Sequence, residues 1–335
     1  MVNLFPWQTA QWQLYEQARV NNRLAHALLL SGPAGMGKNQ FTNLLSASML
    51  CFSPLENYFP CNQCKSCVLI NAGNHPDINY IRPEEAGKQI KVDLIRELIG
   101  FINLKSQYER HKIAVINPAE AMNRSAANTL LKTLEEPPAL SMLILVSHRP
   151  DLLPVTIRSR CQQIRFNPAI DEETVAWLRT TGGVTENTEI LLNMAGGAPL
   201  IAAEMHEQGD IEIQDELIKD LESLQQGRDD PIRVAEKWNR SGAIRIFVWL
   251  MQLVYDMVRL KSSTPVVRLY QVDTSRRLQQ LTNQLDLFKL STCYELLLKN
   301  YALSTAQTSF NTQGLLEDFS IYWQGQFKAT GGQAR

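Results

Sequence analysis

The chain has 335 residues, of which 44% are hydrophobic and 20% charged, and its formal net charge is −1. These values are ordinary for a folded globular protein. They exclude a largely disordered or fibrous chain, and the length favours two or three domains. The near-neutral balance hides a split, because residues 1–165 carry 17 Lys and Arg against 12 Asp and Glu, whereas residues 166–207 carry 1 against 7. The acidic segment indicates either a domain boundary or an exposed acidic face.

Export and membrane signals are lacking in the sequence. Residues 1–13 contain no basic stretch followed by an apolar run, and the most apolar helix candidate, residues 243–260, includes Arg245, Asp256 and Arg259. Charges are costly in lipid, so this segment is predicted to be a core helix. We therefore expect a cytoplasmic protein without membrane contact, whose six cysteines are reduced thiols or metal ligands rather than disulfides.

The first half of the chain alternates short apolar runs with helical patterns. Strands are predicted for residues 27–30, 77–81, 112–116, 142–146 and 161–166, and helices for 38–50, 92–102 and 125–135. Ser125 is expected to start the last helix, and the two prolines from Pro137 onward to follow its end. This alternation implies a parallel sheet covered by helices on both faces.

Strand signals vanish after Pro168. Short helices are predicted for residues 171–180 and 189–194 and directly after Gly196 and Gly197. From residue 211 the chain is expected to be helical, with breaks at Gly227, at Ser241-Gly242, at 262–265 and near Gly314, and with a frayed tail after Phe327. The predicted organisation is an α/β domain (1–166), a small helical domain (167–208) and an all-helical domain (209–335).

A phosphate-loop motif lies between the strand at 27–30 and the helix at 38–50. Gly32, Gly35, Gly37 and Lys38 match the Gly-x4-Gly-Lys pattern, in which glycines let backbone N–H groups curl around phosphates and the lysine reaches the terminal phosphate groups. The Ser or Thr that would bind Mg²⁺ is replaced by Asn39. Whether this degenerate loop still binds ATP or ADP stays open at this point.

The carboxylates needed for ATP hydrolysis are missing as well. In phosphate-loop ATPases an acidic pair after a central strand binds Mg²⁺ and polarises water. Here the strand at 112–116 ends in Asn117 and Pro118, and Glu120 follows without supporting spacing. The sequence predicts a chain that does not hydrolyse ATP.

Four cysteines indicate a metal site. Cys51, Cys61, Cys64 and Cys67 follow the spacing C-x9-C-x2-C-x2-C, which suits a structural, tetrahedral Zn²⁺ with no open position. An iron–sulfur cluster is the competing hypothesis. The isolated Cys161 and Cys293 are expected to be ordinary packing residues, and His75 a loop residue rather than a further ligand.

Two segments together indicate a family. Residues 126–138 (AANTLLKTLEEPP) and 153–161 (LPVTIRSRC) resemble the signatures of AAA+ clamp-loader subunits of bacterial DNA polymerase III. The resemblance spans the whole chain in domain order. It implies an AAA+ phosphate-loop sheet domain with an inserted zinc module at about 51–67, a helical lid and a C-terminal helical collar. Leu200 stands where an active subunit would offer a nucleotide-sensing arginine.

The resemblance also implies a role for Arg160. Its Ser-Arg-Cys context matches the motif whose arginine acts in trans on ATP bound to a neighbouring subunit. Implied partners are the gamma/tau and delta clamp-loader subunits, the beta sliding clamp and primer–template DNA. DNA phosphates would meet groups such as Lys88, Lys91 or Arg124.

Three functional hypotheses follow. The first is a non-hydrolysing scaffold, or stator, that donates Arg160 during clamp loading. The alternative within the family is a hydrolysing, gamma/tau-like motor subunit, and the third is a stand-alone zinc-dependent nucleic-acid binder. The apolar stripe of the helix at 243–260 (Ile244, Phe247, Val248, Met251, Val254) is predicted to serve both bundle packing and contacts with sister subunits.

Overall fold

The computed structural model describes residues 4–85, 87–168, 170–262, 272–305 and 310–327. It divides into two compact units, Met1–Thr188 with Ala195–Ala203 and Glu189–Met194 with Glu204–Arg335. The division passes through helices α8 (Thr188–Met194) and α9 (Pro199–Glu207). The three-domain boundaries expected from the sequence stay a prediction.

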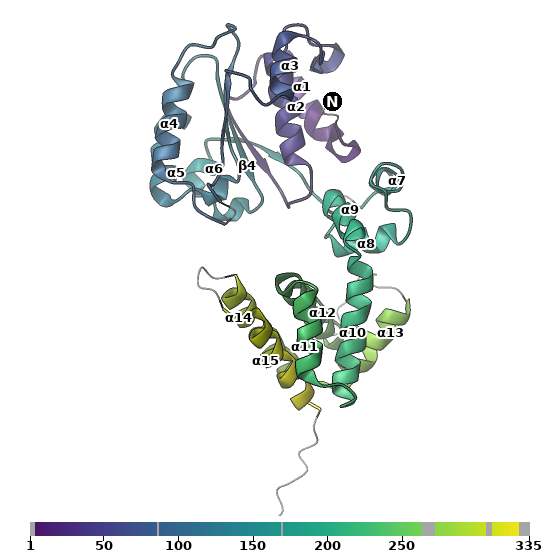
Figure 1. Cartoon of the computed structure of the whole chain (residues 1–335). Coiled ribbons are helices and arrows are strands. Elements are labelled where there is room, and N and C mark those ends of the chain that lie inside the picture. Colours follow the sequence, from purple (N-terminus) through teal and green to yellow (C-terminus); the bar gives the residue numbers. More distant parts are fainter. Residues whose placement is uncertain (1–3, 86, 169, 263–271, 306–309, 328–335) are drawn as a thin grey trace, which may run out of the picture. The chain divides into compact units, whose positions relative to one another are not determined.

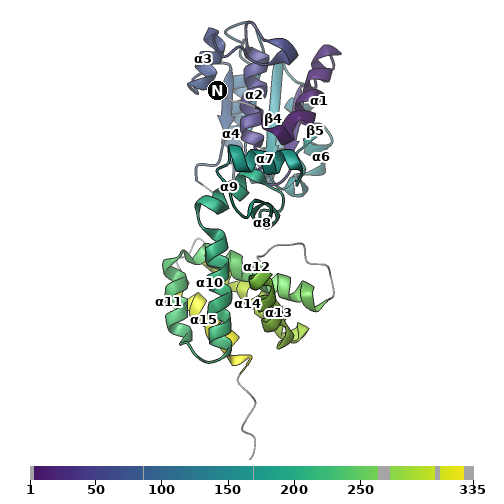
Figure 2. The same ribbon diagram turned by 90° about the vertical axis from the view of Figure 1, so that its right-hand side faces the viewer.

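The first unit contains the predicted parallel sheet. Its strand order is β2 (Ile78–Ile81), β3 (Lys112–Ile116), β4 (Ser141–Ser147), β1 (Ala27–Ser31) and β5 (Gln162–Arg165), and every neighbouring pair is parallel. Helices α4 (Val92–Ile102), α5 (Arg124–Glu135) and α6 (Val155–Arg158) cover one face. Helices α1 (Thr9–Val20) and α2 (Lys38–Leu50) cover the other, with α3 (Lys65–Asn71) beside α2 (Figures 1 and 2).

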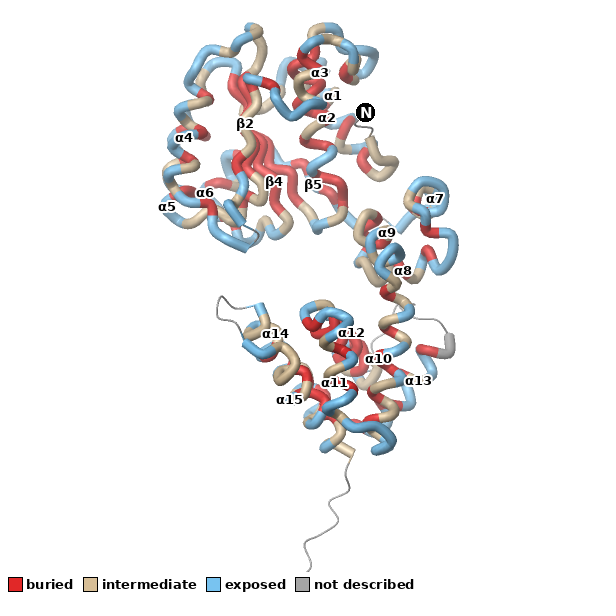
Figure 3. Tube along the Cα trace, viewed as in Figure 1, coloured by how far each residue is buried: buried red, intermediate tan, exposed pale blue. Residues whose placement is uncertain are grey.

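Alternate strand residues build a separate core on each face of the sheet. Leu29 and Leu145 pack into the layer of α4 and α5, whereas Leu28 and Ile144 pack into the layer of α1 and α2. Central strands are buried along their length, as the tube in Figure 3 makes visible. This double burial explains why these strands read as continuous apolar runs in the sequence.

The N-cap of α5 lies two residues before the predicted Ser125. Asn123 caps the helix, because its side-chain oxygen accepts a hydrogen bond from the backbone N–H of Ala126 at 2.8 Å. Ser125 therefore lies inside the first turn. Asn and Ser are comparable N-cap residues, so the sequence alone does not distinguish them.

The second unit is entirely helical within its described residues. Its helices are α10 (Asp210–Gln225), α11 (Pro231–Arg240), α12 (Ala243–Lys261), α13 (Val272–Asn283), α14 (Leu287–Ser304) and α15 (Thr312–Gly325). The expected break near Gly314 is confirmed and lies just before that residue, because Asn311 caps α15 and Gly314 is in its first turn. A break before Asp286, which caps α14, was not foreseen. The break expected at 262–265 falls largely outside the described residues. The tail after residue 327 also lies outside them.

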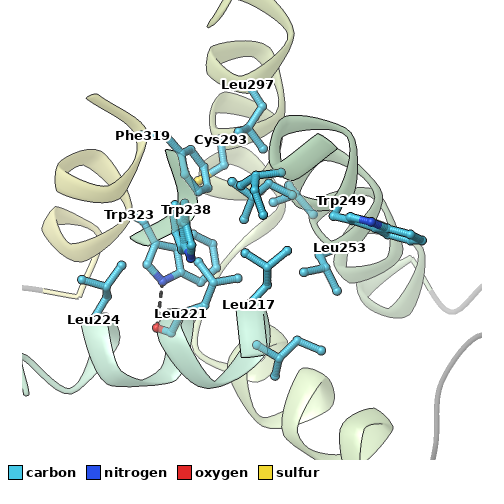
Figure 4. Packing of buried hydrophobic residues seen from close by; sticks show 14 of the residues in the cluster. Leu217, Leu221, Leu224, Trp238, Trp249, Leu253, Cys293, Leu297, Phe319 and Trp323 are labelled. Atoms are coloured by element: carbon cyan, nitrogen blue, oxygen red, sulfur yellow. Dashed lines mark hydrogen bonds between the residues drawn. The ribbon is translucent and has the colours of Figure 1, made fainter. Parts of the chain in front are cut away.

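Large aromatic side chains fill the core of this helical unit. Trp238, Phe319 and Trp323 lie together in Figure 4, and the Trp323 indole N–H donates to the Leu221 carbonyl oxygen at 3.1 Å. Burying the indole is therefore compatible with satisfying its one donor.

Helix α12 is a core helix, as predicted. The apolar residues expected to form one stripe along it are partly buried and partly exposed. Phe247 and Val254 are buried, whereas Ile244 and Val248 are 49% and 45% exposed.

Among the described helices, none has the length and apolar character needed to cross a membrane.

Candidate functional site

The glycines of the phosphate loop adopt conformations that favour glycine. Gly32, Gly35 and Gly37 have φ of 144°, 75° and 75°. A Cβ on Gly32 would lie 2.1 Å from the Phe166 carbonyl oxygen. The loop therefore needs glycine for backbone shape and for close packing against the end of β5.

Lys38 points back onto its own loop. Its ammonium group donates to the carbonyl oxygens of Gly32 at 2.6 Å and Pro33 at 2.5 Å, and the residue is only 3% exposed. Burial lowers the lysine pKa to about 8, against the opposing effect of Glu120. Two donors of the group that would reach phosphates thus already have partners in the chain.

The N-terminal turn η1 (Pro6–Gln8) packs on the outer side of the same loop. The fully buried Gln8 amide donates to the carbonyl oxygens of Met36 at 2.8 Å and Gly37 at 3.0 Å, and the Trp7 indole donates to Met36 at 3.2 Å. The sequence analysis missed this contact. The only local signal is a Pro-Trp-Gln turn, which does not indicate what it packs against.

A residue of α9 closes the loop from another direction. The Cβ position of Gly35 lies 2.6 Å from Cγ1 of Ile201, and the backbone N–H of Leu200 donates to the Gly35 carbonyl at 3.2 Å. Leu200, the residue in place of a sensing arginine, is therefore close to the loop without offering a charge.

The two residues that replace Mg²⁺-binding groups contact each other. The Asn117 side-chain amide donates to Oδ1 of Asn39 at 2.7 Å. Glu120 is used elsewhere, because its Oε1 accepts the backbone N–H groups of His148 at 2.9 Å and Arg149 at 3.2 Å. Burial raises the Glu120 pKa, but hydrogen bonds from its own backbone and from His148 outweigh this, so the net pKa is lowered.

Arg160 lies on the surface of the first unit, just after α6. Its Nε donates to Oε1 of Glu135 at 2.8 Å, its Nη2 forms an ion pair with the same oxygen at 2.5 Å, and Nη1 donates to the Thr156 carbonyl at 3.0 Å. The side chain of Arg160 is 35% exposed. Leu152 and Val155, 53% and 68% exposed, lie shortly before it in the chain.

The four cysteines come together as one cluster at the end of α2 and the start of α3. The Sγ atoms of Cys51 and Cys61 are 3.5 Å apart, those of Cys51 and Cys64 4.0 Å, and those of Cys61 and Cys67 4.0 Å. All four sulfurs lie within 4.8 Å of one another. Tetrahedral zinc with Zn–S bonds of about 2.3 Å would require sulfurs about 3.8 Å apart, so the donor set fits such an ion.

Backbone amides favour thiolates at this cluster. The N–H groups of Cys61 and Cys64 donate to the sulfurs of Cys51 and Cys61, each at 3.3 Å. Hydrogen bonds from the backbone of Gln63 and Cys64 lower the pKa of Cys61 to about 6. Burial raises the pKa of the Cys51 and Cys67 thiols. The four cysteines can therefore hold a metal such as zinc, for which deprotonated sulfur is the ligand.

Both ring nitrogens of His75 contact groups other than the cysteine cluster. It is 5% exposed, its Nε2 is 3.0 Å from the Ser66 hydroxyl, and its Nδ1 accepts the backbone N–H of Asp77 at 3.1 Å. Both ring nitrogens thus brace the loop after α3. The isolated Cys161 and Cys293 are buried, as expected of packing residues.

The candidate DNA contacts lie near the carboxyl ends of β2 and β3. Lys88 lines a cavity of about 570 Å³ together with Arg82 and Arg149. Lys91 is the N-cap residue of α4, and Arg124 is the first residue of α5. Lys88 already forms an ion pair with Glu85 at 2.6 Å.

The fold and these sites together define a phosphate-loop protein with a parallel sheet domain and a C-terminal helical domain. Its nucleotide loop lacks the hydroxyl and carboxylate groups that bind Mg²⁺ in active members.

Comparison with known proteins identifies the particular family. The family described as "DNA polymerase III, delta subunit" matches residues 7–169, and its C-terminal counterpart matches residues 208–325. The chain is similar to DNA polymerase III subunit delta′ of Pseudomonas aeruginosa, with 34% identity over 96% of this chain and 98% of that protein. The chain therefore belongs to the family of DNA polymerase III delta′ subunits.

Two further similarities are more limited. Subunit tau/gamma of Haemophilus influenzae is 36% identical over 47% of this chain and 22% of that protein. A solved Thermotoga maritima gamma subunit-related protein has a TM-score of 0.48 and 16% identity, covering 95% of this chain and 100% of that one.

Proposed function

We propose that this chain is a non-hydrolysing stator of the DNA polymerase III clamp loader that supplies Arg160 in trans to ATP on a neighbouring subunit. It acts with gamma/tau-type and delta-type subunits when the beta sliding clamp is placed on primer–template DNA. It has no catalysis of its own and contributes to the polymerase holoenzyme through complex membership.

The state of the nucleotide loop supports the non-hydrolysing part of the proposal. Lys38 is bound to loop carbonyls, and Asn39 is bound to Asn117. Glu120, the carboxylate that follows β3, uses its Oε1 to accept backbone N–H groups after β4. A gamma/tau-like motor function would require Mg²⁺ at a position where two neutral amides meet instead.

One observation carries the trans role. The guanidinium of Arg160 is held at the surface by Glu135 and Thr156 rather than by its own phosphate loop. An arginine placed on a neighbour's γ-phosphate neutralises charge that develops in the transition state, which raises hydrolysis by about 10³- to 10⁵-fold. The exposed Leu152 and Val155 provide apolar area for an interface around it.

The helical unit supports assembly into an oligomer. Ile244, Val248 and Tyr255 of α12 are 49%, 45% and 48% exposed, although the opposite side of the same helix is fully buried. We assign this exposed side to contacts with sister subunits in a collar.

We assign a structural role to zinc bound by Cys51, Cys61, Cys64 and Cys67. When bound, zinc supplies cross-linking of the segment between α2 and α3 and no reaction chemistry, because four thiolates leave no open position. We also assign DNA phosphate contacts to Lys88, Lys91 and Arg124, at the ends of the strands and the starts of α4 and α5.

The test is a clamp-loader complex reconstituted with Arg160→Ala, compared with the unchanged chain. We expect normal assembly by native mass, but slower ATP hydrolysis at the facing site and slower clamp loading. Arg160→Lys should rescue poorly, because an ammonium lacks the planar fork that spans phosphate oxygens. Normal loading by an intact Arg160→Ala complex would overturn the trans role.

A further inference from the structure

We propose that Glu135 is a positioning residue for Arg160, fixing the guanidinium so that its remaining donors are available to phosphate on the neighbouring subunit. This inference rests on the trans role of Arg160 proposed above. It concerns the carboxylate at the end of α5, in a Leu-Glu-Glu-Pro segment whose sequence assigns Glu135 no function.

The contact between the two residues uses one edge of the guanidinium. Nε donates to Oε1 of Glu135 at 2.8 Å and Nη2 forms an ion pair with the same oxygen at 2.5 Å, while Nη1 donates to the Thr156 carbonyl at 3.0 Å. A guanidinium has five N–H donors in one plane. Two are used by these hydrogen bonds, so the second donor of Nη1 and the donors of Nη2 remain for an incoming oxyanion.

Glu135 and Arg160 each lie next to buried residues in the chain. Glu135 is the last residue of α5 and follows Leu134, which is 2% exposed. Arg160 lies between Ile157 and Cys161, which are 0% and 7% exposed and belong to the same core cluster as Leu134. The carboxylate and the guanidinium therefore meet across two elements anchored in one core, which makes their separation a property of the fold.

Stability does not account for this pair. The side chains of Glu135 and Arg160 are 50% and 35% exposed, and ion pairs at such exposure contribute little to folding. Orientation is a different matter, because a flexible arginine side chain must lose rotamer freedom before it can bind phosphate oxygens. A carboxylate that binds Nε orders the arginine side chain before the subunits engage. This ordering matters because small errors in the position of a catalytic group lower the reaction rate by large factors.

The experiment uses the full chain in the reconstituted clamp-loader complex and measures single-turnover ATP hydrolysis as a function of ATP concentration. Glu135→Ala should lower the maximal rate at the facing site about tenfold and leave the ATP concentration for half-maximal rate unchanged. Glu135→Gln should retain most of the rate, because the amide oxygen still accepts from Nε. The matched control is Glu136→Ala, which removes the adjacent exposed carboxylate and should have no effect.

The double variant separates positioning from a general structural effect. In the Arg160→Ala background, Glu135→Ala should cause no further loss, since there is no guanidinium left to orient. A loss of the same size in both backgrounds, or a higher rate in Glu135→Ala, would overturn the inference while the trans role of Arg160 stands. An Arg160→Ala complex with the unchanged rate would instead refute the proposed function on which the inference depends.

Discussion

Replacing Cys64 by serine tests the metal centre most directly. Serine keeps a side chain suited to the N-cap of α3, where Cys64 lies, so the change removes a thiolate without disfavouring the helix start. We expect the purified chain to carry close to one zinc ion and Cys64→Ser to lose it, because three thiolates hold the ion less tightly than four.

The expected loss of stability follows from the segment that the metal closes. Treated as a cross-link between Cys51 and Cys67, the site restricts a segment for which loop closure contributes about 3 kcal/mol. For a unit of this size, each kcal/mol shifts the melting temperature by about 2–4 °C, so the sheet unit should melt about 6–12 °C lower.

Metal analysis and thermal unfolding together provide the assay. A chelator should lower the melting temperature of the unchanged chain toward that of Cys64→Ser and should not affect the variant further. Acid should release the ion, because the ligands must be thiolates. Cys161→Ala is the control, since it removes a buried thiol of the same unit and should leave the metal content unchanged. Metal-free protein with an unchanged fold and melting temperature would refute the reasoning, and bound iron would favour the cluster hypothesis.

Two other predictions concern the nucleotide loop and the helical core. The chain alone should hydrolyse ATP only at the background rate, because Asn39 and Asn117 replace the groups that bind Mg²⁺; turnover that Lys38→Ala abolishes would contradict this. Trp323→Phe should lower the free energy of unfolding by about 1–3 kcal/mol, measured by denaturant titration, because it leaves the buried Leu221 carbonyl without its indole donor and removes core volume. A change below about 0.5 kcal/mol would show that this hydrogen bond does not matter to the core.

The order of elements and the chemistry of the motifs were determined by the sequence itself. All five strands of the described sheet were predicted, the central ones from apolar runs, and 3- and 4-residue steps predicted α4, because burial patterns repeat with the period of the local backbone. Close sequence spacing likewise predicted that Cys61, Cys64 and Cys67 share one site. Helix starts were less certain, as Asn123 and Ser125 illustrate, since neighbouring residues can serve equally well as caps.

Only the tertiary structure decided which groups meet across the fold. Gln8 reaches the Gly37 carbonyl from 29 positions away, Arg160 meets Glu135 across 25 positions, and Asn117 meets Asn39 across 78. Neither periodicity nor turn chemistry carries information about such pairs, because both describe the backbone over a few residues. Hydrogen bonds require donor and acceptor within about 3 Å. That separation is set by how helices pack on the sheet, so the partner of a surface arginine is determined only when the core beneath it is formed.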